Sequence, residues 1–138
     1  MKSNNPDFFI VDEDDATCTV LEAFFKLKGY SSLCVSTGTK ALELLKEITP
    51  KIILLDILLP DIKGYDVCKK IKSDEKLSSI PIFYTSALPE LNISEHIVDT
   101  KADGYFLKPF DFTEFNSLFA YLEWKLCKLF ILFGRCFR

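Results

Sequence analysis

The segment Lys51-Ile-Ile-Leu-Leu-Asp-Ile-Leu-Leu-Pro-Asp-Ile-Lys-Gly64 holds four consecutive apolar residues followed by a single acid, Asp56. An apolar run without alternation is typical of a strand buried on both faces, as in a parallel sheet. Pro60 and Gly64 then break regular structure, so Asp56 is expected where a buried strand passes into a loop. Taken alone, the segment fits equally well a carboxylate placed for chemistry and a solubilising acid at a strand end.

Short apolar runs and helical patterns alternate along the rest of the chain. Besides the central strand, the pattern predicts strands at residues 8–11, 32–35, 80–85 and 104–107. It predicts helices from Asp14 or Asp15 to Gly29, from Thr37 to Pro50, from about Tyr65 to Lys72, within residues 89–101, and from Asp111 or Thr113 onward. Five alternations of strand and helix indicate an α/β fold: a parallel sheet with helices on both faces and right-handed crossovers.

Length and composition narrow the class of protein. The chain has 138 residues, of which 49% are hydrophobic, so one globular domain with a proper core is expected. The formal net charge of -3 gives no general attraction to nucleic acid. The charge is uneven, because residues 124–138 carry four basic residues and no acid. That basic segment is also rich in apolar residues.

The cysteines and the termini bear on the cellular compartment. The cysteines are odd in number and form no Cys-x-x-Cys pair, which argues against a zinc site and a disulfide framework and favours reduced thiols. The N-terminus lacks the apolar run of a signal peptide. The apolar run Leu129 to Phe133 is far shorter than the roughly 20 residues that span a bilayer. A cytoplasmic location is therefore expected. The five cysteines are Cys18, Cys34, Cys68, Cys127 and Cys136.

Polar residues follow four of the predicted strands, at the point where each strand ends. Asp12 and Glu13 follow the first, Asp56 the third, Ser86 the fourth and Lys108 the fifth. These ends share one edge of a parallel sheet, where open α/β sheets bind their ligands.

Clustered carboxylates need a cation, and an all-oxygen ligand set selects Mg²⁺. A metal, a hydroxyl and an ammonium together form a pocket for a phosphoryl group. Because Asp56 stands alone on the central strand, it is the predicted nucleophile that forms an acyl phosphate.

Four segments in this order and spacing resemble the response-regulator receiver domain. Asp56 lies 30 residues before Ser86, and Ser86 lies 22 residues before Lys108, which are the intervals of that family. The resemblance covers about residues 7–123 and leaves residues 124–138 as a basic, apolar helical extension. It implies a doubly wound, flavodoxin-like sheet of five parallel strands in the order 2-1-3-4-5, with helices on both faces. The segments are Phe8 to Asp14, Ile52 to Gly64, Ile80 to Ala87 and Ala102 to Phe110.

The resemblance also implies chemical roles for the residues at the strand ends. Asp56 would accept a phosphoryl group from phosphohistidine on a sensor histidine kinase or a histidine phosphotransfer protein. Glu13, Asp56 and the backbone carbonyl of Leu58 would bind Mg²⁺, with Asp12 acting through water. Lys108 would pair with the phosphoryl oxygens. The protein would then be a phosphoprotein that catalyses only its own phosphotransfer and is not otherwise an enzyme.

The resemblance further implies a two-state switch. Ser86 would move to bond the phosphoryl group, and Tyr105 would turn inward to fill the space that Ser86 leaves. This change would reshape the face made by helix four, strand five and helix five, to which a downstream target protein or an output domain would bind. A homodimer is left open, and direct nucleic-acid contact is not expected.

Three residues depart from the family pattern. The family most often has Asp where Glu13 stands, so metal affinity is expected to be weaker, or Asp14 would substitute. Leu58 and Leu88 occupy positions that often carry polar groups placing a hydrolytic water. Two leucines cannot do this, which predicts a long-lived phosphoryl state.

Several alternatives remain at this point. One is a degenerate receiver that is never phosphorylated and only binds proteins, an interpretation that Glu13 alone supports. Another is a haloacid-dehalogenase-type phosphatase, which needs a second acid where Leu58 stands. The extension after Trp124 could pack on the domain itself, be the stub of a longer protein, dock on a partner helix or contact an anionic membrane surface. His96 is expected to be a surface residue.

Overall fold

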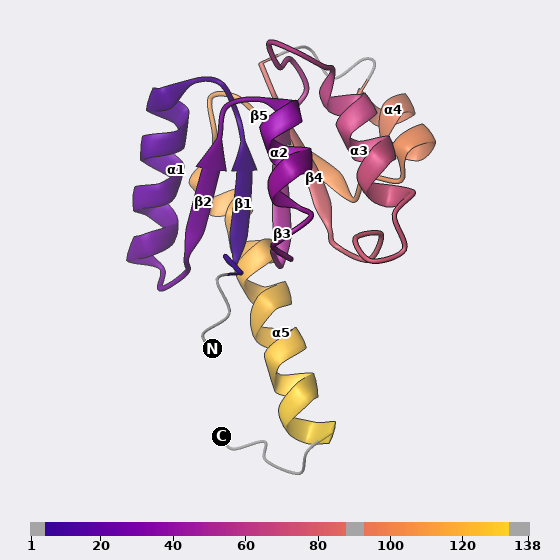
Figure 1. Cartoon of the computed structure of the whole chain (residues 1–138). Helices are drawn as coiled ribbons and strands as arrows, with labels where there is room; N and C mark the ends of the chain where they lie inside the picture. The colour runs from indigo at the N-terminus through magenta and orange to yellow at the C-terminus, as the bar shows by residue number, and fades with distance from the viewer. Residues whose placement is uncertain (1–4, 88–92, 133–138) are drawn as a thin grey trace. The chain divides into compact units, whose positions relative to one another are not determined.

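The computed structural model describes residues 5–87 and 93–132, with the side chains of 129–132 left aside. One five-stranded parallel sheet forms in the order β2-β1-β3-β4-β5, which confirms the predicted fold class and strand order (Figure 1). The strands are β1 Phe8–Val11, β2 Ser32–Val35, β3 Ile52–Asp56, β4 Ile82–Ser86 and β5 Gly104–Leu107. The helices are α1 Asp15–Leu27, α2 Gly38–Leu44, α3 Gly64–Lys72, α4 Ile93–Thr100, the 3₁₀ helix η2 Phe112–Phe115 and α5 Asn116–Leu132.

Helices cover both faces of the sheet because alternate strand residues point to opposite sides. On one face, Phe9, Ile53 and Tyr84 join a buried cluster with residues of α2, α3 and α4. On the other face, the Phe8 ring stacks on Phe25 of α1, with ring centroids 3.9 Å apart. Every residue of β1 and β3 is buried, which explains why their sequences are uninterrupted apolar runs up to the acid.

Local signals account for the ends of the first two helices. The Asp14 carboxylate accepts hydrogen bonds from the backbone N–H and hydroxyl of Thr17 and so caps α1. Gly29 has a φ of +90°, a left-handed conformation that suits glycine, and follows the last turn of α1. Thr37 caps α2 by accepting from the backbone N–H of Lys40.

Two elements differ in extent from the prediction. The fourth strand begins at Ile82 rather than Ile80, because Ile80 closes a turn through its N–H bond to the carbonyl of Leu77. Helix α2 ends at Leu44, and residues 45–47 form turns in place of the predicted helix to Pro50. These shifts involve local hydrogen bonds at element ends, which apolar periodicity does not specify.

The chain divides into two compact units, residues 1–108 and 109–138. In the second, Asp111 caps η2 through the backbone N–H of Thr113. Leu118, Phe119 and Leu122 are buried, whereas Trp124 and Leu126 are more than half exposed. In the part of the chain that the structure describes, no helix has the length and apolar character that crossing a membrane requires. The boundary at residues 123 and 124 stays a prediction, and Phe133 lies outside the described residues.

Candidate functional site

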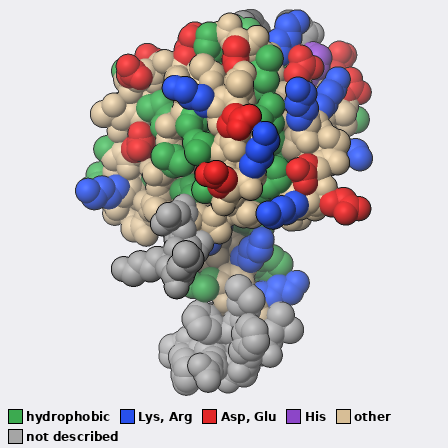
Figure 2. All heavy atoms as spheres, in the orientation of Figure 1, with side chains coloured by type: hydrophobic (Ala, Val, Ile, Leu, Met, Phe, Trp, Pro, Cys, Tyr) green, Lys and Arg blue, Asp and Glu red, His purple; other side chains and the backbone are tan. Residues whose placement is uncertain are grey.

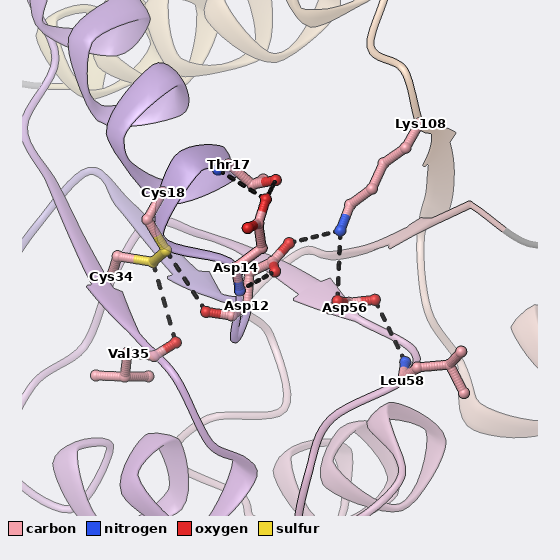
Figure 3. Close-up of polar contacts among 9 residues, drawn as sticks. All are labelled: Asp12, Asp14, Thr17, Cys18, Cys34, Val35, Asp56, Leu58 and Lys108. Carbon is pink, nitrogen blue, oxygen red and sulfur yellow. Dashed lines mark hydrogen bonds and ion pairs between the residues drawn. A yellow bond between two sulfur atoms is a disulfide. The ribbon is translucent and has the colours of Figure 1, made fainter.

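Three of the predicted site residues meet at the carboxyl edge of the sheet. Asp12 follows β1, Asp56 ends β3, and Lys108 follows β5. The parallel register places these strand ends beside one another, with Val11 opposite Leu55. Figure 3 shows the Lys108 side chain reaching toward both carboxylates. We call Asp12, Asp56 and Lys108 the strand-end site.

One ammonium group serves two carboxylates in the strand-end site. Lys108 Nζ lies 2.7 Å from Asp12 Oδ2 and 3.4 Å from Asp56 Oδ2. Asp12 is 2% exposed and Asp56 is 8% exposed. Because ionised carboxylates are seldom buried without a partner, this geometry keeps two negative charges in place with a single shared cation. The three side chains therefore carry a net charge of -1 when all are ionised.

Burial and charge shift the titration of the site. Burial, reinforced by the negative charge of Asp12, raises the pKa of Asp56 to about 6, against the opposing effect of Lys108. Burial lowers the pKa of Lys108, but its contacts with Asp12 and Asp56 outweigh burial, so the net shift is upward. At neutral pH Asp56 is thus mostly ionised, in an environment that disfavours its charge. Such a carboxylate gains from a further cation and is a reactive nucleophile.

Backbone groups orient the two carboxylates. The N–H of Asp14 donates to Asp12 Oδ1 at 2.9 Å, and the N–H of Leu58 donates to Asp56 Oδ1 at 3.3 Å. The loop after Asp56 folds back so that the N–H of Gly64 donates to the carbonyl of Ile57 at 2.8 Å. A Cβ at Gly64 would overlap the backbone carbonyl of Asp56. Glycine is therefore required here for close approach of two backbone segments.

The donor set of the site fits a hard divalent cation only in part. Asp12 and Asp56 supply buried carboxylate oxygens of the kind that Mg²⁺ prefers. Glu13 is exposed, and the Asp14 carboxylate is engaged in capping α1, so the structure gives no support for Asp14 as a substitute ligand. Over residues 5–87 and 93–132, no three His, Cys, Asp or Glu side chains gather as a metal cluster. Glu13 and the Leu58 carbonyl therefore stay predicted ligands.

The two residues of the predicted switch lie on neighbouring strands. Ser86 ends β4, is 2% exposed, and its carbonyl accepts from the N–H of Lys108 at 2.8 Å. Tyr105 in β5 is half-buried against the cluster that contains Tyr84, the residue opposite it in the register. Leu88 lies outside the described residues. The structure thus places Ser86 next to the backbone that carries Lys108.

The cysteine prediction is wrong for one pair. Cys18 of α1 and Cys34 of β2 form a disulfide, with Cα atoms 6.0 Å apart (Figure 3). The two residues are 16 apart in sequence and lie on different kinds of element, so their spacing carries no pairing signal. Only the packing of α1 beside β2 brings them together. Cys68 is a buried free thiol.

Comparison with known proteins agrees with this geometry. The family model described as response regulator receiver domain matches residues 8–120. The chain is 31% identical over 109 residues to the DNA-binding dual master transcriptional regulator RpaA of a Synechocystis species, covering 79% of this chain and 45% of RpaA. It is 32% identical over 109 residues to the regulatory protein AtoC of Escherichia coli, covering 79% and 23%. The chain thus spans less than half the length of these relatives.

Solved structures give the same picture of the fold. A two-component response regulator from Clostridium difficile has a TM-score of 0.74 at 25% identity, covering 88% of this chain and 96% of that one. The receiver domain of the sensor histidine kinase PA1611 from Pseudomonas aeruginosa has a TM-score of 0.74 at 24% identity, covering 83% and 93%. That domain holds a magnesium ion in its active-site cleft.

Proposed function

The chain belongs to the response-regulator receiver family, and from this premise we propose that it is a signalling switch in which Asp56 accepts a phosphoryl group from phosphohistidine. The donor is a sensor histidine kinase or a histidine phosphotransfer protein of a two-component system or phosphorelay. The observation that carries the proposal is the Lys108 ammonium shared by two buried carboxylates. An acid kept only for solubility has no reason to be buried in this way.

The transfer uses groups that the strand-end site already contains. An oxygen of Asp56 attacks phosphorus, the phosphorus–nitrogen bond of phosphohistidine breaks, and its electron pair stays on the imidazole. An acyl phosphate forms on Asp56. Lys108, 3.4 Å from the carboxylate, is placed to offset negative charge on the incoming phosphoryl oxygens. The leaving imidazole belongs to the donor, so no group of this chain has to protonate it.

Mg²⁺ is the cofactor that we propose for this step. Asp56 would hold it directly and Asp12 through water, and Glu13 and the Leu58 carbonyl are the further ligands that the family resemblance implies. When bound, the ion supplies positive charge that the site lacks while one ammonium serves two carboxylates. The Asp12 carboxylate stays oriented by the Asp14 N–H, and the Asp56 carboxylate by the Leu58 N–H.

The signal would pass from Ser86 through two strands. Ser86 is joined to β5 through the N–H of Lys108, and β4 is joined to α4 through the hydroxyls of Tyr84 and Thr100, 2.5 Å apart. A shift of Ser86 toward the phosphoryl group would therefore act on Tyr105 in β5 and on α4. The output surface would comprise α4 and β5, with the last helix as the third element that the resemblance names.

The partners would be proteins. Figure 2 shows acidic and basic side chains intermingled on the visible face of the described residues, which offers no extended basic footprint there for nucleic acid. A downstream target protein or an output domain would read the α4–β5 surface, and a homodimer is a further option. Contact of the basic segment 124–138, whose charge is +4, with an anionic membrane surface is the less favoured alternative.

Incubation with acetyl phosphate and Mg²⁺ followed by intact mass tests the proposal. We expect one phosphoryl adduct on the wild type, lost on hydroxylamine treatment as acyl phosphates are, and no adduct on Asp56→Asn. Asp61→Asn is the matched control, because it removes an aspartate from the loop that follows Asp56 and should keep the adduct. A wild type that stays unmodified would favour the degenerate receiver.

The lifetime of the adduct tests the prediction that Leu58 slows hydrolysis of the acyl phosphate. Its side chain is 58% exposed beside the acceptor and offers no polar group to a hydrolytic water. We expect Leu58→Asn to lose phosphate up to about tenfold faster than the wild type, because one added hydrogen bond to the hydrolytic water is worth up to about 1.5 kcal/mol. The decay of the intact-mass adduct after removal of acetyl phosphate gives the rate. Leu58→Met, which adds no hydrogen-bonding group, should decay like the wild type; equal decay of all three would refute the argument.

A further inference from the structure

A disulfide ties the start of α1 to the edge strand of the sheet, next to the strand-end site. Cys18 lies in the first turns of α1, and Cys34 lies in β2, with 6.0 Å between their Cα atoms. This separation falls in the range that a disulfide spans without movement of the backbone. The two positions therefore suit a disulfide in this fold, and closing or opening the bond needs no rearrangement of the sheet.

One sulfur atom of the disulfide contacts the carbonyl of Asp12, and the other contacts the carbonyl that accepts the N–H of Asp12. Cys18 Sγ lies 3.5 Å from the carbonyl oxygen of Asp12, and Cys34 Sγ lies 4.0 Å from that of Val35. The same Val35 carbonyl accepts the N–H of Asp12 at 3.0 Å. The Asp12 carboxylate binds Lys108, so the disulfide contacts the backbone of a residue that belongs to the strand-end site. In Figure 3 the disulfide lies on one side of Asp12 and Lys108 on the other.

Reagents in solution can reach the disulfide. Cys18 and Cys34 are only half-buried and line a hollow of about 370 Å³. Asp12 lines the same hollow, together with the charged side chains of Glu22 and Lys40. A thiol can therefore approach the sulfur atoms without unfolding of the sheet, whereas the free thiol of Cys68 is buried.

We propose that Cys18 and Cys34 form a reversible thiol–disulfide site whose state tunes the strand-end site. Persistent disulfides are rare in the cytoplasm, where those that occur are mostly transient and redox-sensing. The oxidant is a low-molecular-weight disulfide. One cysteine thiolate attacks it and releases a thiol, and the second thiolate then attacks the resulting mixed disulfide and releases another. Two protein thiols and one small disulfide thus give one protein disulfide and two small thiols.

The bond acts on Asp12 as a positioning element. When it is closed, α1 and β2 are held together beside the carbonyl of Asp12 and the Val35 carbonyl that accepts the N–H of Asp12. When it is open, that restraint is lost, and Asp12 is held only by its own hydrogen bonds. Groups that orient a metal ligand typically change affinity by about ten- to a hundredfold. The oxidised form is accordingly the one that binds Mg²⁺ more tightly. The effect on Mg²⁺ binding rests on the proposed function, whereas the thiol–disulfide chemistry of Cys18 and Cys34 does not.

Redox titration of the full chain tests the inference. All variants carry Cys127→Ser and Cys136→Ser, so that Cys18 and Cys34 are the only exposed pair. After equilibration in glutathione buffers, alkylation and peptide mass mapping report the disulfide, and calorimetry reports Mg²⁺ affinity. We expect a reversible Cys18–Cys34 bond and an affinity about tenfold weaker after reduction. Cys18→Ser with Cys34→Ser should show one affinity in both buffers, close to the reduced value.

Two results would overturn the inference. One is failure of the two cysteines to pair in fully oxidised buffer. The other is equal Mg²⁺ affinity, or none, in both redox states. Acetyl phosphate treatment of the same samples separates the two proposals: if Asp56 stays unmodified while the affinity still changes with redox state, the proposed function fails and the redox site stands.

Discussion

Asp56 ends β3 and Asp61 lies in the loop that follows, yet their environments shift their pKa values in opposite directions. Asp56 is buried beside Asp12, and its pKa rises to about 6. Asp61 is exposed, and hydrogen bonds from the Thr39 hydroxyl and from the N–H groups of Gly38 and Thr39 hold its pKa well below its usual value. Asp61 thus stabilises the start of α2, whereas Asp56 is kept charged at the expense of stability. An aspartate thus stabilises a helix at position 61, whereas at position 56 it belongs to the strand-end site.

The largest effect is expected from removing the cation of the strand-end site. Lys108→Met leaves two buried carboxylates without a cation, so the free energy of unfolding at pH 7 should fall by about 3 kcal/mol. The loss should shrink at pH 5, because Asp56 takes up a proton as the pH falls through its pKa of about 6. Urea denaturation at the two pH values measures this.

Lys46→Met is the matched control for Lys108. Its ion pair with Glu43 is exposed, with both side chains about two-thirds accessible, so the change should be below about 0.5 kcal/mol. Equal losses for the two variants would mean that burial of Asp12 and Asp56 contributes nothing to the difference between them.

A gain in stability is expected when the acceptor loses its charge. The pKa of Asp56 is raised in the folded state, so the folded protein binds the proton more tightly than the unfolded chain does. The free energy of unfolding therefore falls as the pH rises from about 4 to about 6. Above that range the ionised carboxylate is destabilising. Asp56→Asn should therefore raise the free energy of unfolding at pH 7 by about 2 kcal/mol in the presence of a chelator. It should also flatten the pH profile.

Thermal or urea unfolding of Asp56→Asn from pH 4 to pH 8 gives that profile. The advantage of the variant should vanish at pH 4, where the wild-type carboxyl group is protonated in the folded state. An advantage that persists unchanged at pH 4 would assign the gain to packing and would contradict the electrostatic account.

The smallest effect is expected at the capping aspartate. Asp61→Ala removes three hydrogen bonds at the start of α2, so the Tm at pH 7 should fall while acetyl phosphate still modifies Asp56. Because the pKa of Asp61 is lowered by folding, its stabilisation is present at neutral pH and is lost only as the pH falls below the usual range of aspartate. Calorimetry at pH 7 with Asp99→Ala, an exposed aspartate late in α4, as control measures the difference. Loss of the adduct would show that the two aspartates do not act separately.

Much of the fold and part of the site could be predicted because their signals are local. The runs before Asp12 and Asp56 are buried on both faces in β1 and β3, so uninterrupted apolar sequence marked them. The edges of elements were less well predicted, as at Ile80 and Leu44, because single backbone hydrogen bonds decide them. The cysteine interpretation failed for a different reason, because the pairing of Cys18 with Cys34 depends on how α1 packs beside β2.

The sequence by itself determined the alternation of strands and helices and, through it, the gathering of Asp12, Asp56 and Lys108. Parallel strands end at one edge, so residues that follow them must be neighbours whatever their separation along the chain. The tertiary structure alone decided the sharing of one ammonium by two carboxylates, the capping of α2 by Asp61 and the pairing of Cys18 with Cys34. These depend on distances and side-chain directions between segments far apart in the chain, which no local periodicity encodes.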